Sequence, residues 1–267
     1  MHVLGVRTCL CGSFGGEAGA VAATLIAGEG LGVRTVGAAG ANGTYIHDRR
    51  SGERVALAEV APSPLSRHEV ELYGIALVEG LEADICVLGG PVTPEVLPAD
   101  TYRRLAADLT ANGRRVVADL SGEPLAAVLA GGITVLKVSH EELLAEGRAA
   151  DDSPAALVAA MEALTAEGAA NVVVSRAGDP TLAMLDGRLL QTTAPTLDPL
   201  DTRGAGDSLT AGLTAGLARG LDLDDAVRLG VAAGSSNVTR RGMATGHRDV
   251  IERLVDHVEV ASFDGAG

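Results

Sequence analysis

The sequence has no tryptophan, aromatic residues amount to only 2% of the chain, and Lys137 is its one lysine. The core must therefore be built from alanine, valine and leucine rather than from aromatic rings. Lys137 follows Val135 and Leu136 instead of a glycine-rich loop, which excludes a Gly-Lys-Ser/Thr phosphate-binding loop. The motif set of protein kinases is missing as well.

An excess of positive charge and a long apolar run are also missing. The formal net charge of −14 argues against nucleic acid or an anionic membrane as a partner. No apolar run approaches the ~18 residues of a membrane span, and we find no charged-then-apolar secretory leader. We therefore expect a cytoplasmic protein with no membrane association.

Cysteine is scarce. Cys9, Cys11 and Cys86 are odd in number and lie in apolar segments, so we expect buried, reduced thiols rather than disulfides. Cys9 and Cys11 would share one face of a strand. No histidine or second cysteine pair is nearby, which favours core packing over metal binding there.

Short apolar runs alternate with helical patterns along the 267 residues, a length that can bury a sizeable core. The alternation predicts an α/β fold with a doubly wound, mainly parallel sheet and helices on both faces. Strands are expected at 6–11, 85–88, 116–120, 135–138 and 172–175, and helices at 17–27, 66–79, 99–112, 141–146, 154–167, 206–218, 223–239 and 249–257. A hairpin is expected at 181–185 and 188–192, around Asp186 and Gly187.

Residues 33–60 have a different pattern. Short strands at 33–38, 44–47 and 54–58 are separated by turn residues, which indicates a meander rather than a helical crossover. We expect a small β lid at about 33–60, within a single domain that spans 1–267.

Residues 201–212 place a glycine-rich turn and the carboxylate of Asp207 at the start of a helical run. The N–H groups of Gly204, Ala205 and Gly206 are expected to form an anion hole at the helix N-terminus, suited to a phosphoryl group in transit. Asp207 would take the proton from an attacking hydroxyl. An ordinary helix cap explains part of the pattern, but the whole string favours phosphoryl transfer to an alcohol.

This stretch resembles the C-terminal signature of the PfkB (ribokinase-like) carbohydrate kinases, Asp-Thr-x-Gly-Ala-Gly-Asp followed by a small-residue helix. The resemblance runs through most of the chain. It implies a ribokinase-like fold, ATP as phosphate donor, Mg²⁺, and a possible homodimer formed through the lid.

The strand expected at 116–120 ends in Asp119, Leu120 and Ser121. Ligands in open α/β sheets bind beyond the carboxyl ends of strands, so Asp119 and Ser121 are candidates for the substrate side. A turn with a helix cap is the alternative. The run resembles the Asp-x-Ser-Gly-Glu stretch of the 1-phosphofructokinase and tagatose-6-phosphate kinase branch, which implies a hexose phosphate as acceptor.

Residues 137–142 resemble the family's Lys-Pro-Asn-x-x-Glu run, whose glutamate helps to hold the Mg²⁺ of the nucleotide. Glu142 matches that glutamate, while Ser139 replaces the asparagine. A carboxylate suits a hard cation near phosphates. A capping box between Ser139 and Glu142 explains the same residues. The capping role and the magnesium role of Glu142 are compatible with each other.

Two further segments resemble parts of the family that contact the nucleotide. Ser175 and Arg176 match the strand and loop beside the phosphates, although Ala177 replaces a glycine there. An exposed turn arginine is an equal alternative for Arg176. Asn237 matches a helix position beside the base and ribose, with a packing role as the alternative.

Family members typically begin with a strand that ends in Asn-Pro-x-x-Asp and carry a Gly-Gly-Lys-Gly-x-Asn helix start. Neither motif occurs here, and the resemblance opens at the second strand, near Gly5 and Val6. We expect apolar surface to be left uncovered by this difference.

The sequence therefore predicts an ATP-dependent phosphotransferase that acts on a hydroxyl of a sugar phosphate, similar to 1-phosphofructokinase. Its partners would be a sugar phosphate and a nucleotide, not nucleic acid. A kinase for another sugar or a nucleoside is one alternative. A shortened, non-catalytic nucleotide-binding relative is the other.

Overall fold

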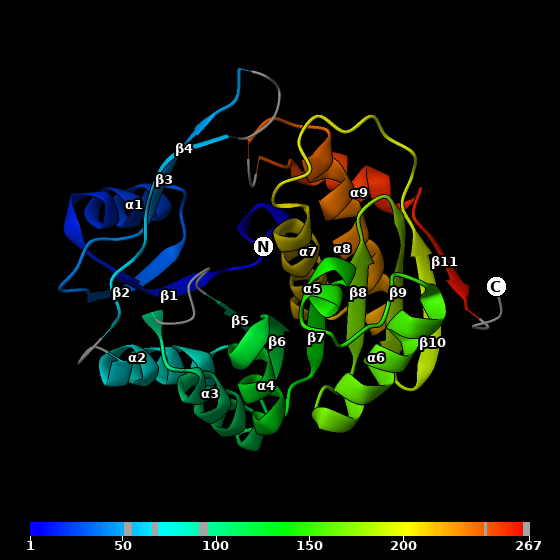
Figure 1. Ribbon diagram of the computed structural model, residues 1–267, viewed down its shortest axis with the longest axis horizontal. Coiled ribbons are helices and arrows are strands. Elements are labelled where there is room, and N and C mark those ends of the chain that lie inside the picture. The colour runs from blue at the N-terminus through cyan, green and yellow to red at the C-terminus, as the bar shows by residue number, and fades with distance from the viewer. Residues whose placement is uncertain (51–54, 66–68, 91–95, 243–244, 264–267) are drawn as a thin grey trace.

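The computed structural model describes residues 1–267 except 51–54, 66–68, 91–95, 243–244 and 264–267. Its centre is a seven-stranded sheet with the order β11-β10-β9-β8-β7-β6-β5 (Figure 1). The strands are β5 (Ile85–Gly89), β6 (Arg115–Asp119), β7 (Val135–Ser139), β8 (Val172–Arg176), β9 (Asp179–Leu185), β10 (Arg188–Thr193) and β11 (Glu259–Ser262). β5 to β8 are parallel, whereas β9, β10 and β11 add an antiparallel edge. The predicted parallel sheet is thus confirmed for β5 to β8.

Helices cover both faces of this sheet (Figure 1). They are α3 (Ala99–Ala111), α4 (Gly122–Gly131), α5 (His140–Ala145), α6 (Pro154–Glu167), α7 (Ala205–Ala218), α8 (Leu223–Val238) and α9 (Arg248–Val255). Successive β6 residues separate two cores, because Val116 and Ala118 pack with α3, α4 and α6 while Val117 packs with α7, α8 and α9. This alternation is the pleat of a strand that is buried on both faces.

The N-terminal part is a separate layer. β1 (Cys9–Phe14) and β2 (Gly32–Gly37) form a parallel pair, joined by α1 (Gly16–Gly28) and packed against α2 (Glu69–Glu82). Among the described residues, neither strand is hydrogen-bonded to the seven-stranded sheet.

The lid is smaller than we expected. β3 (Thr44–Asp48) and β4 (Val55–Val60) form an antiparallel pair, but the strand expected at 33–38 belongs to β2 and pairs parallel with β1. The prediction of a three-strand meander was wrong because the α1 crossover turns β2 into a partner of β1. Arg54, the first residue of the expected 54–58 strand, lies outside the described residues.

The β9–β10 hairpin was predicted from its turn residues, whereas helix α4 was not predicted at all. The hairpin between β9 and β10 turns at Asp186 and Gly187, which both have positive φ, as the predicted Asp-Gly turn requires. Helix α4 begins after Ser121, a residue type that favours helix starts, and is short and mostly apolar.

The prediction of buried thiols was wrong. Cys9 is exposed, and Cys11 and Cys86 are partly buried; all three are free. Cys11 is still desolvated enough by its surroundings that its pKa rises to about 12. In the part of the chain that is described, no helix is long and apolar enough to cross a membrane.

Candidate active site

A cavity of about 520 Å³ lies at the carboxyl ends of β5 and β6, beside the start of α7. This is where open α/β sheets place their ligands. The polar side chains that line it include predicted residues from three separate segments: Asp119, Ser121, Glu142 and Asp207. The fold thus gathers groups that lie up to 88 positions apart in the chain.

Helix α7 starts at this cavity because it packs very closely on α8. A Cβ at Gly212 would stand 2.8 Å from both the Ala233 Cβ and the Leu229 carbonyl oxygen, so only glycine permits this approach. Gly204 precedes the helix with φ 77°, a left-handed conformation that glycine adopts without strain. The small residues of the signature therefore position the helix N-terminus.

The backbone at this helix start offers free donors. Within the described chain, the N–H groups of Gly204 and Gly206 donate to no protein acceptor, whereas that of Ala205 donates to the Thr202 carbonyl at 3.3 Å. The N–H of Asp207 is free as well, so it is a donor that the sequence prediction missed. Free N–H groups at a helix N-terminus favour an anion.

Asp207 is an exposed residue at the rim of the cavity. None of the described residues forms a hydrogen bond or ion pair with its carboxylate. Its oxygens are therefore available to accept a proton from a bound hydroxyl.

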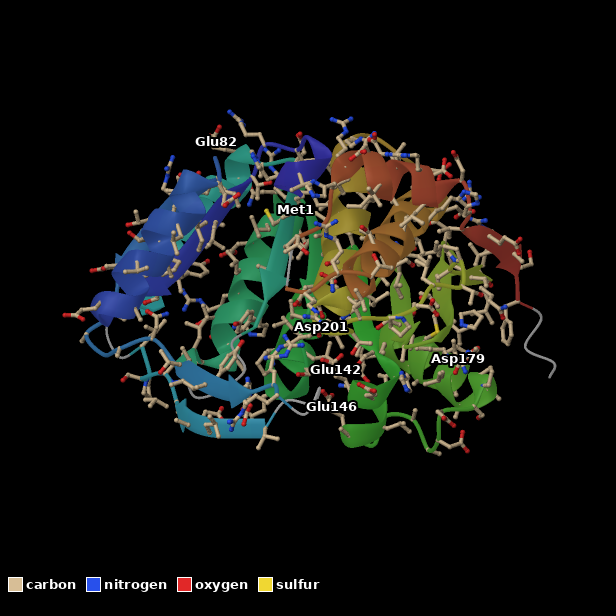
Figure 2. The ribbon with its side chains drawn as sticks, turned by 90° about the horizontal axis from the view of Figure 1, so that it is seen from above. Met1, Glu82, Glu142, Glu146, Asp179 and Asp201 are labelled. Atoms are coloured by element: carbon tan, nitrogen blue, oxygen red, sulfur yellow. The ribbon has the colours of Figure 1, made fainter. Side chains whose placement is uncertain are left out.

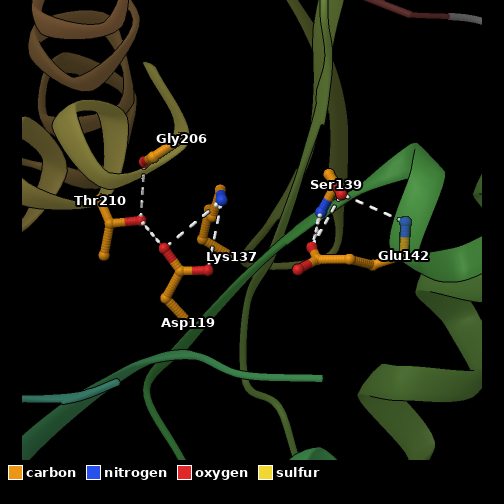
Figure 3. Close-up of polar contacts among 6 residues, drawn as sticks. All are labelled: Asp119, Lys137, Ser139, Glu142, Gly206 and Thr210. Atoms are coloured by element: carbon orange, nitrogen blue, oxygen red, sulfur yellow. Dashed lines mark hydrogen bonds and ion pairs between the residues drawn. The ribbon is translucent and has the colours of Figure 1, made fainter. Parts of the chain in front are cut away.

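The capping box predicted between Ser139 and Glu142 is present (Figure 3). The Glu142 Oε2 atom accepts hydrogen bonds of 2.8 Å from both the backbone N–H and the hydroxyl of Ser139. The Oε1 atom has no such partner among the described residues, and Glu142 lines the cavity. One carboxylate oxygen thus fixes the helix while the other faces the site.

Asp119 and Ser121 both line the cavity, as expected, but their side chains differ in how far protein groups already occupy their hydrogen-bonding atoms. Asp119 accepts a hydrogen bond from Thr210 and pairs with the ammonium of Lys137. Ser121 is the residue before α4, but its side chain makes no capping hydrogen bond; the N–H of Gly122, the first residue of the helix, donates to Glu146. Ser121 is thus the freer of the two for a ligand.

Ser175, the penultimate residue of β8, pairs with Ser139 of β7, at the same end of the sheet. Arg176 is not an exposed turn residue. Its side chain is 12% exposed and lies 3.8 Å from Asp179 and 3.4 Å from the Asp152 carbonyl. Ala177 follows at φ 50°, an unfavourable conformation for alanine that forms the turn into β9.

Asn237 is buried in α8 and donates its side-chain N–H to the Arg203 carbonyl at 2.7 Å. The residue therefore holds the loop before α7. The same loop contacts the lid, since Arg49 pairs with Asp201 at 2.8 Å and the Arg203 guanidinium stacks over the Tyr45 ring. In Figure 2, Asp201 and Glu142 both lie in the middle of the view.

Lys137 has a structural role that its sequence context did not predict. It is buried in β7, with its Nζ 3.2 Å from Asp119 Oδ1. Its position as the only lysine, inside an otherwise apolar strand, was the available signal. A charged group in such a strand needs a specific partner.

Tyr102 lies beneath the cavity wall at Gly89 and Gly90. Its hydroxyl is 3.4 Å from the Gly89 carbonyl, and burial raises the pKa of Tyr102 to about 12. Tyr102 thus stays neutral at physiological pH and supports the wall rather than exchanging protons.

The fold, the cavity and the signature are matched by known proteins. The family model "pfkB family carbohydrate kinase" matches residues 1–249, so the chain belongs to this family. The predicted membership and the predicted carbohydrate-kinase class are confirmed.

Curated relatives support the phosphofructokinase branch. The chain is 34% identical to the 1-phosphofructokinase of Bacillus subtilis over 179 residues, which cover 67% of this chain and 58% of the relative. It is 29% identical to ATP-dependent 6-phosphofructokinase isozyme 2 of Escherichia coli, over 90% of this chain and 78% of that one. The chain thus spans less than two thirds of the Bacillus relative.

Solved structures confirm the ribokinase-like fold. Phosphofructokinase-2 from Escherichia coli, solved in complex with potassium, superimposes with a TM-score of 0.84 at 27% identity, over 96% of this chain and 84% of that one. Ribokinase from Arabidopsis thaliana shares the fold with a TM-score of 0.75 at 20% identity, over 95% of this chain and 83% of that one.

Proposed function

We propose that this chain transfers the γ-phosphoryl group of ATP to a hydroxyl of a sugar phosphate, in the manner of a 1-phosphofructokinase. The observation that carries the proposal is the unpaired Asp207 carboxylate, placed beside free N–H groups of α7 at the rim of one cavity. Phosphoryl transfer needs little covalent chemistry from the protein. It depends on positioning and on stabilising charge.

In this mechanism Asp207 accepts the proton of the attacking hydroxyl. The N–H groups of Gly204, Gly206 and Asp207 stabilise the charge on the transferred group, and that of Ala205 joins them if its long bond to Thr202 opens. Ser121 contacts the sugar phosphate. Ser175, Arg176 and Asn237 form the nucleotide side.

The residues present fit a magnesium ion bound with the nucleotide. The described residues hold no group of three or more metal-ligating side chains. Mg²⁺ is commonly bound through one or two carboxylates together with substrate phosphates and water, so the free Oε1 atom of Glu142 suffices on the protein side. The ion would neutralise phosphate charge when bound.

The first prediction concerns Asp207. Asp207→Asn should lower kcat by about 10²- to 10⁴-fold, the usual contribution of a general base, with ATP binding retained. ADP production is measured against a panel of sugar phosphates and nucleosides, beside the wild type and the control Asp256→Asn, an exposed residue just after α9. Wild-type turnover in Asp207→Asn would contradict the assigned role.

The same panel separates the alternatives. Turnover with a ribose or a nucleoside but not with hexose phosphates would indicate another acceptor. ATP binding by the wild type without ADP production from any acceptor would support the non-catalytic alternative.

We also propose a homodimer in a reducing compartment such as the cytoplasm. The three free cysteines are consistent with that compartment. A related enzyme, phosphofructokinase-2 from Escherichia coli, has been solved in a tetrameric inhibited form. Light scattering of the purified chain tests the assembly, and a monomeric mass at all concentrations would contradict the dimer.

A further inference from the structure

A buried ion pair lies directly below the start of α7. Lys137 is 5% exposed, and its Nζ lies 3.2 Å from Oδ1 and 3.4 Å from Oδ2 of Asp119 (Figure 3). Removing an ammonium from water is costly unless a well-placed anion compensates it. Asp119 is the residue that makes this buried charge tolerable.

Thr210 fixes Asp119 from the other side. The Thr210 hydroxyl lies 2.6 Å from Asp119 Oδ2 and 3.1 Å from the Gly206 carbonyl oxygen (Figure 3). A hydroxyl has one proton to donate, and the short bond to a charged acceptor is the stronger of the two. This contact joins α7 to β6 across 91 positions of sequence.

The ammonium held in this way touches the anion-hole turn. A Cβ at Gly206 would stand 2.6 Å from Lys137 Nζ, so the charge lies against the backbone whose N–H groups are free. A positive charge here adds to the dipole at the helix N-terminus. Its effect depends on its position, because Coulomb energy in a protein interior changes steeply with distance.

We propose that Asp119 and Thr210 are positioning residues: through a Thr210–Asp119–Lys137 chain they hold the ammonium against Gly206 and so shape the charge of the phosphoryl-transfer site. This inference rests on the proposed kinase function. It also changes the expected role of Asp119 from substrate binding to positioning, because its carboxylate is already bound to Thr210 and Lys137.

The test uses a matched pair of threonines on α7. Thr214 is also buried and donates to the carbonyl one turn back, at Thr210, but does not contact Asp119. Thr210→Val should lower kcat by about 10- to 100-fold with KM values changed less than about 3-fold, because only the charge position is lost. Thr210→Ser should restore most of kcat, and Thr214→Val should stay near wild type.

Equal kcat losses in Thr210→Val and Thr214→Val would overturn the proposal, since they would reflect packing alone. A failure of Thr210→Ser to recover kcat would do the same. Thermal denaturation of each variant shows whether it is folded.

A second measurement does not need turnover. Because Lys137 is the one lysine, ¹³C-lysine labelling of the chain with a lysine-free tag gives a single side-chain signal. Thr210→Val should move the Lys137 Cε–Hε cross-peak by several linewidths, whereas Thr214→Val should leave it nearly in place. Equal movement in both would overturn the chain of contacts even in an active enzyme. Selective movement in a chain without kinase activity would show that the contacts stand and the proposed function fails.

Discussion

The N-terminal region, residues 1–82, and the region from residue 97 onward differ sharply in how they use apolar side chains. Among the residues that the structure describes, eleven of the twelve exposed large hydrophobic side chains lie in the N-terminal region, and Leu200 is the exception. Among described residues before 83, the buried hydrophobic side chains are only those of Leu4, Val36 and Leu65. Apolar sequence alone therefore does not make a core. A second surface must be present to cover it.

The difference in packing also separates the elements that carry the proposed catalytic residues from the lid. The catalytic candidates lie on elements that are anchored in the two cores, such as β6, β7 and α7. Described residues of the lid contact the loop before α7 through the Arg49–Asp201 ion pair and the stacking of Arg203 over Tyr45. The proposed catalytic residues thus lie on well-packed elements, while an exposed ion pair of the kind that attaches the lid contributes little to stability.

The largest expected contrast comes from a pair of leucines. Leu213 on α7 is fully buried, and Leu25 on α1 is 66% exposed. Leu213→Ala should lower the free energy of unfolding by about 2–5 kcal/mol through the cavity it leaves. Leu25→Ala should change it by less than about 0.5 kcal/mol. Urea denaturation followed by circular dichroism measures both, and comparable losses would break the comparison by showing that α1 is covered in solution.

Two helical glycines should respond in opposite directions. Gly212→Ala should destabilise the protein by about 1–3 kcal/mol, because the new Cβ meets Ala233 and the Leu229 carbonyl. Gly74→Ala on α2 should stabilise it by about 0.5–1 kcal/mol, since nothing lies within 4 Å and alanine favours the helix. Melting temperatures give the signs. A stable Gly212→Ala variant would show that α7 and α8 can move apart at little cost.

The smallest effect is expected at the lid. Arg49→Ala removes the ion pair to Asp201 and should change the free energy of unfolding by no more than about 1 kcal/mol. It should nevertheless speed proteolytic cleavage within the lid, because the contact to the loop before α7 is lost. Arg50→Ala is the control, since Arg50 pairs with Asp48 inside the lid itself. Equal cleavage rates in the two variants would argue against the attachment.

Local patterns sufficed for much of the fold. Helix 154–167 was predicted with its observed bounds, since Ser153 caps it and a glycine follows it. The Asp186-Gly187 turn and the Ser139–Glu142 capping box depend on neighbours in sequence and were also predictable. The exposure of Cys9 and the pairing of β2 with β1 were not, because both depend on segments that are distant in the chain.

The sequence by itself determined the family, most of the helices and strands of the main sheet, and the signature that places Asp207 after a glycine-rich turn. Those features are encoded by residues that are close together. Only the tertiary structure joined Asp119, Lys137 and Thr210, which come from β6, β7 and α7. The physical reason is that a buried charge is stabilised by groups that lie close to it in space. A lysine in an apolar strand indicates that a partner is needed, but its sequence neighbours do not identify which residues supply it.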